Sequence, residues 1–338
     1  MDGSGTRGAA TDVPVTACAA HGLPDGALVL PRPACTALPS QVPSCDALVV
    51  GAGPAGLVAA VYLARFRRSV VLVDAGHSRA VRIPRSHNYP GFPEGITGTQ
   101  LTASLRGQAK HYRIEPMPGT VEALRACADG FEASWEGGAV RARTVLLATG
   151  AADVEPPLPH LAEALQEGAL RYCPVCDGFE VVDQHVGVLV DGVAGVAEAL
   201  YLRHFTPRVT VFRVAADVDL PQAETQRLER HGISLVAEPL ASARLWQGRV
   251  TLRHGELETV CDTVYCALGM RVRSDLAVGL AAEVDATGYL RVDAHQRTTV
   301  PGLYAAGDVA SGLNQISVAS GGAAIAASAI HRELGLPS

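Results

Sequence analysis

Short apolar runs alternate with helical patterns in the first half of the chain. Residues 47–50 (Ala-Leu-Val-Val) predict a buried strand, residues 57–65 a helix, and residues 70–73 (Val-Val-Leu-Val) a second strand. Six residues, Gly51 to Gly56, separate the first strand from the helix. A strand, a helix and a strand in this order indicate a βαβ unit and a parallel sheet.

A second copy of the pattern follows further along the chain. Residues 186–190 predict a strand, residues 193–205 a helix and residues 209–212 another strand. Two such units predict an α/β protein with two Rossmann-like, three-layer domains. The buried run 302–308 and the apolar helical pattern of 316–334 close the chain, and we expect them to return to the first domain.

The N-terminal 44 residues show no periodicity of either kind. They are rich in Pro, Ala and small polar residues, which predicts a flexible arm. The start has neither a basic segment nor a long apolar core, so we expect no signal peptide. Glycines and a proline interrupt the apolar stretch 48–64, so we expect no membrane span and place the protein in the cytoplasm.

Bulk composition excludes some classes of partner. The net charge of −6 gives no basic surface for a nucleic acid. Eight cysteines in 338 residues are too few for a disulfide scaffold. We expect Cys18, Cys35 and Cys45, in or beside the arm, to be inert free thiols, with a second redox relay as the alternative.

The turn after the first strand reads Gly51-Ala52-Gly53-Pro54-Ala55-Gly56. In a dinucleotide fold, the first glycine allows the tight turn, the second lets backbone amides approach a pyrophosphate, and the third lets the helix pack on the strand. Asp74 follows 23 residues after Gly51, where a carboxylate accepts from ribose hydroxyls. Together these features predict a dinucleotide site.

The corresponding turn of the second unit is degraded. It keeps Gly192 and Gly195, but Val190 occupies the first glycine position and Asp191 adds negative charge where phosphates would lie. Arg213 ends the second strand, where an arginine can pair with the 2′-phosphate of NADP. A working NADPH site and a domain that has lost this ligand both remain open.

Cys173-Pro174-Val175-Cys176-Asp177 is the main chemical motif of the chain. Two thiols at this spacing can close into a disulfide and reopen, and an acid beside them can exchange a proton. Zinc is the rival, but a structural site needs four ligands. The nearest other pair, Cys261 and Cys266, lies in one strand-like run and points to opposite faces, so we expect both to be buried and no metal to bind.

Five motifs in fixed order make the chain resemble the low-molecular-weight thioredoxin reductase family of FAD-dependent disulfide oxidoreductases. The resemblance covers residues 45–336. The motifs are Gly51 to Gly56, Asn88-Tyr89-Pro90-Gly91-Phe92-Pro93, Leu147-Ala148-Thr149-Gly150, Cys173 to Phe179 and Ala305-Ala306-Gly307-Asp308-Val309. It implies an FAD domain (45–154 plus 285–338), an inserted NAD(P)H-binding-like domain (155–284) that carries the CxxC, and a homodimer.

The resemblance also implies roles for individual residues. Cys176 would face the flavin, Cys173 would exchange with the substrate disulfide, and Asp177 would give and take the proton. Asn88 would lie near the flavin ring, and Gly307 and Asp308 near the ribityl and pyrophosphate groups. The remaining cofactor-binding positions are Gly51, Gly53, Pro54, Ala55, Gly56, Asp74, Thr149, Gly150, Gln315 and Ile316.

The family's NADPH motifs are eroded here, which leaves the electron donor open. NADPH is one donor and ferredoxin is another. The substrate would be a thioredoxin-like protein or a small dithiol or disulfide. The alternatives are an oxidase that passes electrons from a dithiol to oxygen and a non-catalytic flavin redox sensor.

Overall fold

The computed structural model describes residue 38, residues 42–156 and residues 161–336. All of them belong to one compact unit, Pro33–Ser338. Most of the predicted arm, with Cys18 and Cys35, lies outside the described residues. The arm is predicted to end at Ser44, but this residue already begins the first strand, because it pairs with Arg141.

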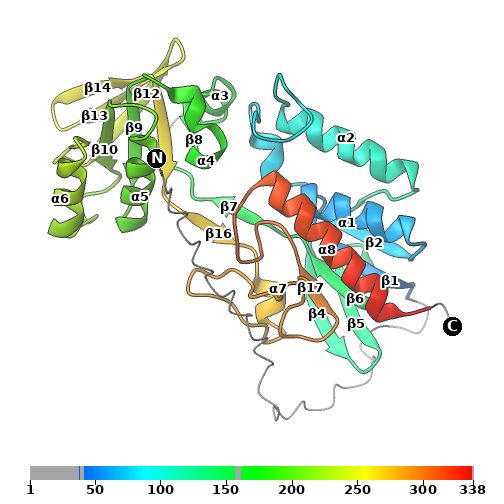
Figure 1. Ribbon diagram of the computed structural model, residues 1–338. Coiled ribbons are helices and arrows are strands. Elements are labelled where there is room, and N and C mark those ends of the chain that lie inside the picture. Colours follow the sequence, from blue (N-terminus) through cyan, green and yellow to red (C-terminus); the bar gives the residue numbers. More distant parts are fainter. Residues whose placement is uncertain (1–37, 39–41, 157–160, 337–338) are drawn as a thin grey trace, which may run out of the picture. The chain divides into compact units, whose positions relative to one another are not determined.

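The first sheet has seven strands in the order β3-β2-β1-β6-β5-β4, with β17 beside β6. Its parallel part joins β1, β2, β3, β6 and β17, and β4 and β5 add an antiparallel extension (Figure 1). The strands are β1 (Ser44–Val50), β2 (Val70–Asp74), β3 (Met117–Pro118), β4 (Val121–Cys127), β5 (Gly130–Trp135), β6 (Gly138–Leu147) and β17 (Leu303–Ala305).

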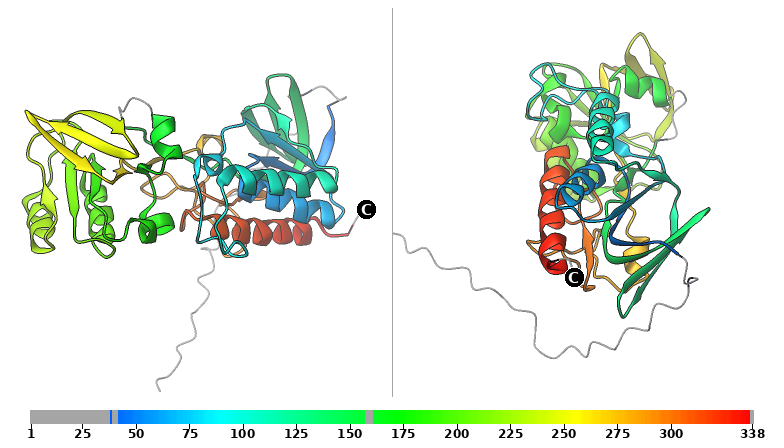
Figure 2. Two further views of the ribbon diagram at one scale, coloured as in Figure 1. Left: turned by 90° about the horizontal axis from the view of Figure 1, so that it is seen from above. Right: turned by 90° about the vertical axis from the view of Figure 1, so that its right-hand side faces the viewer.

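Helices cover this sheet because its strands are apolar on both faces. Ala47 and Val49 of β1 pack against α1 and α8, whereas Leu48 and Val50 face the opposite core, as the period of two in a strand requires. Figure 2 shows α1, α2 and α8 lying along the same face. The helical elements of this part are α1 (Pro54–Arg65), η1 (Arg79–Arg82), α2 (Gly98–His111), α7 (Asp275–Val278) and α8 (Ile316–Leu334).

A second sheet, entirely parallel, has the order β11-β10-β9-β15-β8. A three-stranded antiparallel sheet, β12-β13-β14, packs near it, because both contribute to one hydrophobic cluster. The strands are β8 (Leu170–Arg171), β9 (Val186–Val190), β10 (Val209–Arg213), β11 (Ser234–Leu235), β12 (Leu240–Trp246), β13 (Arg249–His254), β14 (Leu257–Cys261) and β15 (Thr263–Ala267). The helical elements are α3 (Leu161–Gln166), α4 (Pro174–Asp177), η2 (Gly178–Val181), α5 (Val193–Leu202) and α6 (Gln222–Arg230).

The chain passes between the two sheets through a pair of short strands. β7 (Ala151–Asp153) and β16 (Met270–Val272) run antiparallel, with Ala151 opposite Val272. The predicted return at residue 285 differs from the packing, because Ala277 and Ala282 already share a cluster with Leu48 of the first sheet. These small apolar residues follow β16 directly, so the return begins there.

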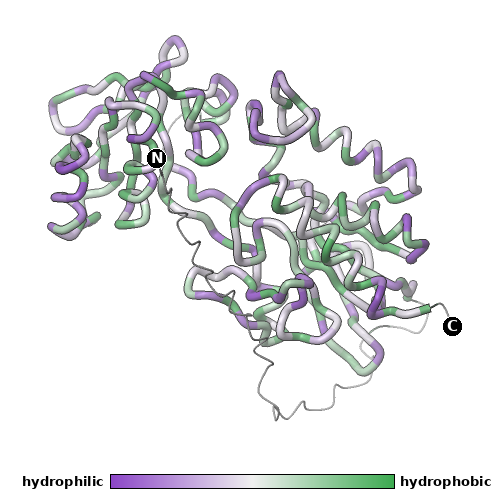
Figure 3. The backbone as a smooth tube through the Cα atoms, in the orientation of Figure 1, coloured by the Kyte–Doolittle hydropathy of each residue, from purple (hydrophilic) through white to green (hydrophobic). Residues whose placement is uncertain are grey.

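The expected α/β class with parallel sheets is confirmed, while several element ends move. The first helix starts at Pro54 rather than at residue 57, because proline suits the first helical position. The second-unit helix stops at Leu202 instead of continuing to Phe205. The strand predicted over 302–308 shrinks to Leu303–Ala305. Figure 3 shows the polar helix α6 in purple and the apolar strands of both sheets in green.

A candidate dinucleotide cavity beside a disulfide

The turn between β1 and α1 accepts only glycine at two positions. Gly51 has φ +101°, and a Cβ there would lie 2.4 Å from the carbonyl oxygen of Ala148. A Cβ on Gly56 would lie 1.8 Å from the carbonyl oxygen of Gly51. The turn is therefore held tightly against β6, and the N-terminus of α1 is left open for an anion.

This helix end opens into a cavity of about 610 Å³. Gly56 lies beneath the turn and is not part of the cavity wall. The wall contains twelve of the predicted cofactor residues together with both thiols and the acid of the CxxC motif. They are Gly51, Gly53, Pro54, Ala55, Asp74, Asn88, Thr149, Gly150, Gly307, Asp308, Gln315, Ile316, Cys173, Cys176 and Asp177.

Asp74 is fixed at the end of β2 by two donors. Its Oδ1 accepts from the backbone N–H of Ala52 at 3.1 Å, and its Oδ2 accepts from Nη2 of Arg106 at 2.8 Å. The contact with Ala52 ties this carboxylate to the glycine turn. It therefore lies where a ribose next to the pyrophosphate would reach it.

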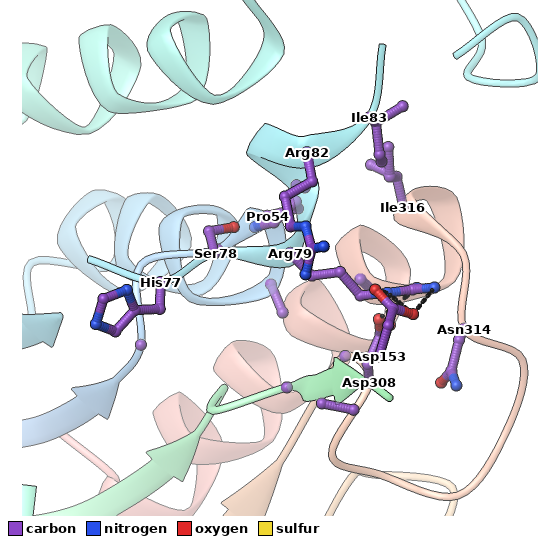
Figure 4. A pocket seen from close by; sticks show the side chains of 18 of the residues that line it. Pro54, His77, Ser78, Arg79, Arg82, Ile83, Asp153, Asp308, Asn314 and Ile316 are labelled. Carbon is purple, nitrogen blue, oxygen red and sulfur yellow. Dashed lines mark hydrogen bonds and ion pairs between the residues drawn. The ribbon is translucent and has the colours of Figure 1, made fainter. Parts of the chain in front are cut away.

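Arg79 of η1 is a cavity residue that sequence reasoning missed. Its Nη2 lies 2.7 Å from Oδ1 of Asp153, and its Nη1 lies 3.4 Å from Oδ2 of Asp308 (Figure 4). Burial raises the pKa of Asp308, and the Arg79 guanidinium opposes that rise. No motif marks residue 79, and only the fold brings it to two carboxylates that are distant in sequence.

Cys173 and Cys176 form a disulfide at one end of the cavity. Nε2 of Gln315 donates to Sγ of Cys176 at 3.2 Å and to Sγ of Cys173 at 3.5 Å. Oε1 of Gln315 accepts from Nδ2 of Asn88 at 3.0 Å. Gln315 therefore contacts the disulfide directly, and Asn88, the residue expected near the flavin ring, is linked to it through Gln315.

Asp177 lies directly after Cys176 and is mostly buried. Its Oδ1 accepts from the hydroxyl of Tyr265 at 2.7 Å, and its Oδ2 lies 3.1 Å from Nη1 of Arg171. Burial raises the pKa of Asp177, and Arg171 and Tyr265 oppose this rise. Sequence reasoning found the acid but neither of its partners, because both come from separate strands.

The second nucleotide fold keeps its glycine packing, but the guanidinium of Arg213 is already bonded. A Cβ on Gly195 would lie 2.5 Å from Cγ1 of Val190, so this glycine is needed for packing α5 on β9. Gly192 precedes α5 and has open space around it. The guanidinium of Arg213 points to backbone carbonyls, with Nη1 3.2 Å from the oxygen of Val218 and Nη2 bonded to that of Ala237. Both Nη atoms of Arg213 therefore have backbone partners in this structure.

Three further cysteines lie away from the cavity wall. Cys45, Cys261 and Cys266 are buried free thiols. Cys261 and Cys266 lie on β14 and β15 rather than in the one strand-like run expected, because the chain turns at Asp262. Burial raises the pKa of Cys45 and of Cys261 to about 12, so neither is a thiolate near neutral pH. In residues 42–156 and 161–336, no group of three metal-binding side chains was found.

Comparison with known proteins agrees with this geometry. A model of the pyridine nucleotide-disulphide oxidoreductase family matches residues 45–323. The chain belongs to this family. The thioredoxin reductase of Treponema pallidum is 32% identical over 295 residues, covering 84% of this chain and 95% of that protein.

Two solved structures of the same family type share the fold. The crystal structure of HlmI is 29% identical, with a TM-score of 0.79, and the match covers 86% of this chain and 92% of that one. The thioredoxin reductase of Streptococcus pyogenes MGAS5005 is 27% identical, with a TM-score of 0.78 and coverage of 86% and 98%. The chain is therefore a flavoprotein disulfide oxidoreductase similar to thioredoxin reductase, and its redox pair is Cys173–Cys176.

The cofactor of this branch of the family is FAD, and the cavity fits it. The turn, in which Gly51 and Gly56 leave no room for a Cβ, would hold the pyrophosphate end. The amides of Gln315 and Asn88 provide donors and an acceptor at the other end.

None of the helices in the described parts of the chain is long and apolar enough to cross a membrane.

Proposed function

We propose that this protein transfers two electrons between FAD and a thioredoxin-like protein, or a small dithiol or disulfide, through the Cys173–Cys176 pair. The observation that carries the proposal is the Gln315 amide, which contacts both sulfurs and the flavin-side residue Asn88. It places the redox pair within the cofactor cavity. The thioredoxin reductases among the relatives favour a thioredoxin as the partner.

We assign the cavity residues as follows. The backbone amides at the start of α1 bind the FAD pyrophosphate, and Asp74 accepts from a ribose hydroxyl. Asp308 and Gly307 contact the ribityl region, Thr149 and Gly150 line the wall, and the backbone of Gln315 and Ile316 meets the pyrimidine edge. When bound, the flavin supplies or accepts the electron pair.

The thiols carry out the exchange with the partner. The reduced pair starts as a thiolate at Cys173 and a thiol at Cys176. The Cys173 thiolate attacks one sulfur of the partner disulfide, so one S–S bond breaks, a mixed disulfide forms and a partner thiolate leaves. Asp177 donates a proton to this leaving sulfur. Cys176 then gives its proton to the Asp177 carboxylate and attacks Cys173, which restores the Cys173–Cys176 disulfide. The second partner sulfur leaves as a thiolate and takes up a proton from water, so the partner is released as a dithiol.

Arg79 should contribute to FAD binding through charge. Without its guanidinium, Asp153 and Asp308 would present uncompensated negative charge to an anionic cofactor. We expect Arg79→Met to weaken FAD binding by about tenfold or more, equal to about 1.4 kcal/mol. Quenching of FAD fluorescence on reconstitution measures this. Arg143→Met, which removes an exposed ion pair with Asp46, is the control and should bind FAD normally.

The second nucleotide fold serves, in this proposal, mainly as a scaffold for the CxxC. Since the Arg213 guanidinium is bonded to backbone carbonyls, we expect no preference for NADPH over NADH. Anaerobic stopped-flow reduction of the yellow protein should give rates for the two donors within about tenfold of each other. Arg213→Met should leave that ratio unchanged.

The same stopped-flow experiment, repeated with other electron donors, separates the candidates. Rapid bleaching by NADPH but not by NADH would overturn the scaffold assignment. Slow bleaching by both, with fast bleaching by a reduced ferredoxin, supports a protein donor. Bleaching by a dithiol with hydrogen peroxide formed in air would mark a dithiol oxidase.

The cytoplasmic location and the homodimer stay predictions, and light scattering at micromolar concentration tests the homodimer.

A further inference from the structure

Two side chains from adjacent strands converge on the acid beside the dithiol. Arg171 of β8 and Tyr265 of β15 are register partners in a parallel pair. Neighbouring partners in a sheet project to the same face and lie side by side. The strand pairing therefore brings a cation and a hydroxyl to one point beneath α4.

The Asp177 carboxylate is held there on both oxygens. The Tyr265 hydroxyl lies 2.7 Å from Oδ1 and 3.1 Å from the Asp177 carbonyl, and Nη1 of Arg171 lies 3.1 Å from Oδ2. Tyr265 is 0% exposed, and the side chains of Arg171 and Asp177 are 18% and 19% exposed. This burial makes the Arg171–Asp177 ion pair stronger than one on the surface.

The two partners act in different ways. Burial and the neighbouring Asp177 carboxylate raise the pKa of Tyr265, so its hydroxyl stays protonated and donates to the carboxylate. Because the tyrosine is fully buried, it does not connect Asp177 to solvent. Tyr265 therefore fixes the direction of the carboxylate, whereas Arg171 supplies a permanent positive charge.

The surroundings of Asp177 shift its pKa in opposite directions. Burial raises its pKa, and so does the carboxylate of Glu180 on η2. Arg171 from β8 and Tyr265 from β15 lower it. The pair thus counteracts burial and Glu180, which both favour the protonated acid.

We propose that Arg171 and Tyr265 are positioning residues that fix the direction of the Asp177 carboxyl group and weaken its hold on the proton, so that it can pass a proton to the leaving sulfur. This rests on the proposed function, in which Asp177 gives the leaving sulfur its proton. The proton is taken up when the thiols release it and is handed on at the next exchange. Neither partner loses or gains a proton in the cycle.

The test is the pH dependence of alkylation of the reduced dithiol in the FAD-loaded protein. Iodoacetamide reacts with the thiolate, and a neighbouring carboxyl adds an inflection to the rate profile. Asp177→Asn removes that inflection and so identifies it. We expect Arg171→Met to move it to higher pH by one unit or more, because loss of the cation favours the protonated acid.

Matched variants separate positioning from folding. Arg171→Lys should give a smaller shift, since it keeps the charge but not the geometry. Tyr265→Phe keeps the ring and should also shift the inflection upward. Tyr304→Phe, another 0% exposed tyrosine, loses a hydroxyl bonded to Glu333 instead and should not shift it. Circular dichroism verifies that each variant folds.

An inflection unmoved in folded Tyr265→Phe and Arg171→Lys, and in Arg171→Met if it folds, would overturn the proposal and leave a purely structural ion pair. If Arg171→Met does not fold, the other two variants still decide. The alkylation experiment needs no partner protein. A failure of the proposed function would instead appear as partner reduction that survives in Cys173→Ser.

Discussion

Replacing Cys176 by serine should trap the protein on its partner. In Cys176→Ser, the remaining Cys173 thiolate can attack a partner disulfide, but no second thiol is present to resolve the product. We expect a stable mixed disulfide with thioredoxin and a loss of turnover of at least about 10³-fold, since the free thiols Cys45, Cys261 and Cys266 are buried and cannot replace Cys176. Mass spectrometry under non-reducing conditions measures the adduct.

The reciprocal variant provides the control. Cys173→Ser should lose turnover to the same extent, keep FAD and form no adduct, because its remaining thiol faces the flavin side. Both sulfurs accept a hydrogen bond from the Gln315 amide in the structure, so this bond does not distinguish the two thiols. The expected difference between the two variants comes from which thiol the partner can reach. Adducts of equal yield from both variants would refute the assignment of Cys173 as the exchanging thiol.

Adding one methyl group at Gly56 should remove both cofactor and stability. A Cβ there would lie 1.8 Å from the Gly51 carbonyl oxygen, which is backbone and cannot swing away. The turn itself must shift, and with it the amides proposed to bind the pyrophosphate. For Gly56→Ala we expect a loss of about 3 kcal/mol in the free energy of unfolding, the upper end for overpacking. We also expect a colourless protein as purified.

A glycine in another helix gives a control of opposite sign. Gly107 lies inside α2, is exposed and has nothing within 4 Å of the position its Cβ would take. Gly107→Ala should therefore keep FAD and gain up to about 1 kcal/mol, since alanine favours helix over glycine. Urea unfolding of both variants, with the flavin absorbance ratio, compares them. Yellow, fully stable Gly56→Ala would contradict the packing seen around the turn.

Periodicity was enough to predict the central elements of the fold. The last helix, α8, has the predicted bounds Ile316–Leu334, and it ends where Gly335 takes a positive φ of +64°. Residues 47–50 of β1 and the whole of β9 were recognisable as apolar runs, as expected for parallel strands buried on both faces. Where the ends moved, local chemistry decided, as with Pro54 at the first position of α1.

The site was predictable only where a motif is continuous along the chain. The glycine turn and the CxxC are local, so their roles follow from spacing. Arg79, Arg171 and Tyr265 carry no such signal, since strand register and tertiary packing alone bring them to their carboxylates. The orientation of Arg213 toward backbone carbonyls was equally hidden, because it depends on where residues 218 and 237 lie.

The antiparallel pairing of β7 and β16 has a consequence for modular engineering. Ala151 and Val272 are paired across the ladder, so the chain leaves and re-enters the first sheet about 5 Å apart. A short turn that joins Ala151 to Val272 at this seam, the β7–β16 pair, could replace the segment between them. The product would be a smaller flavin-binding protein without the CxxC segment. Conversely, a foreign domain whose ends lie one strand spacing apart could be spliced in at the same point. The seam thus gives this chain a ready attachment site for domain exchange.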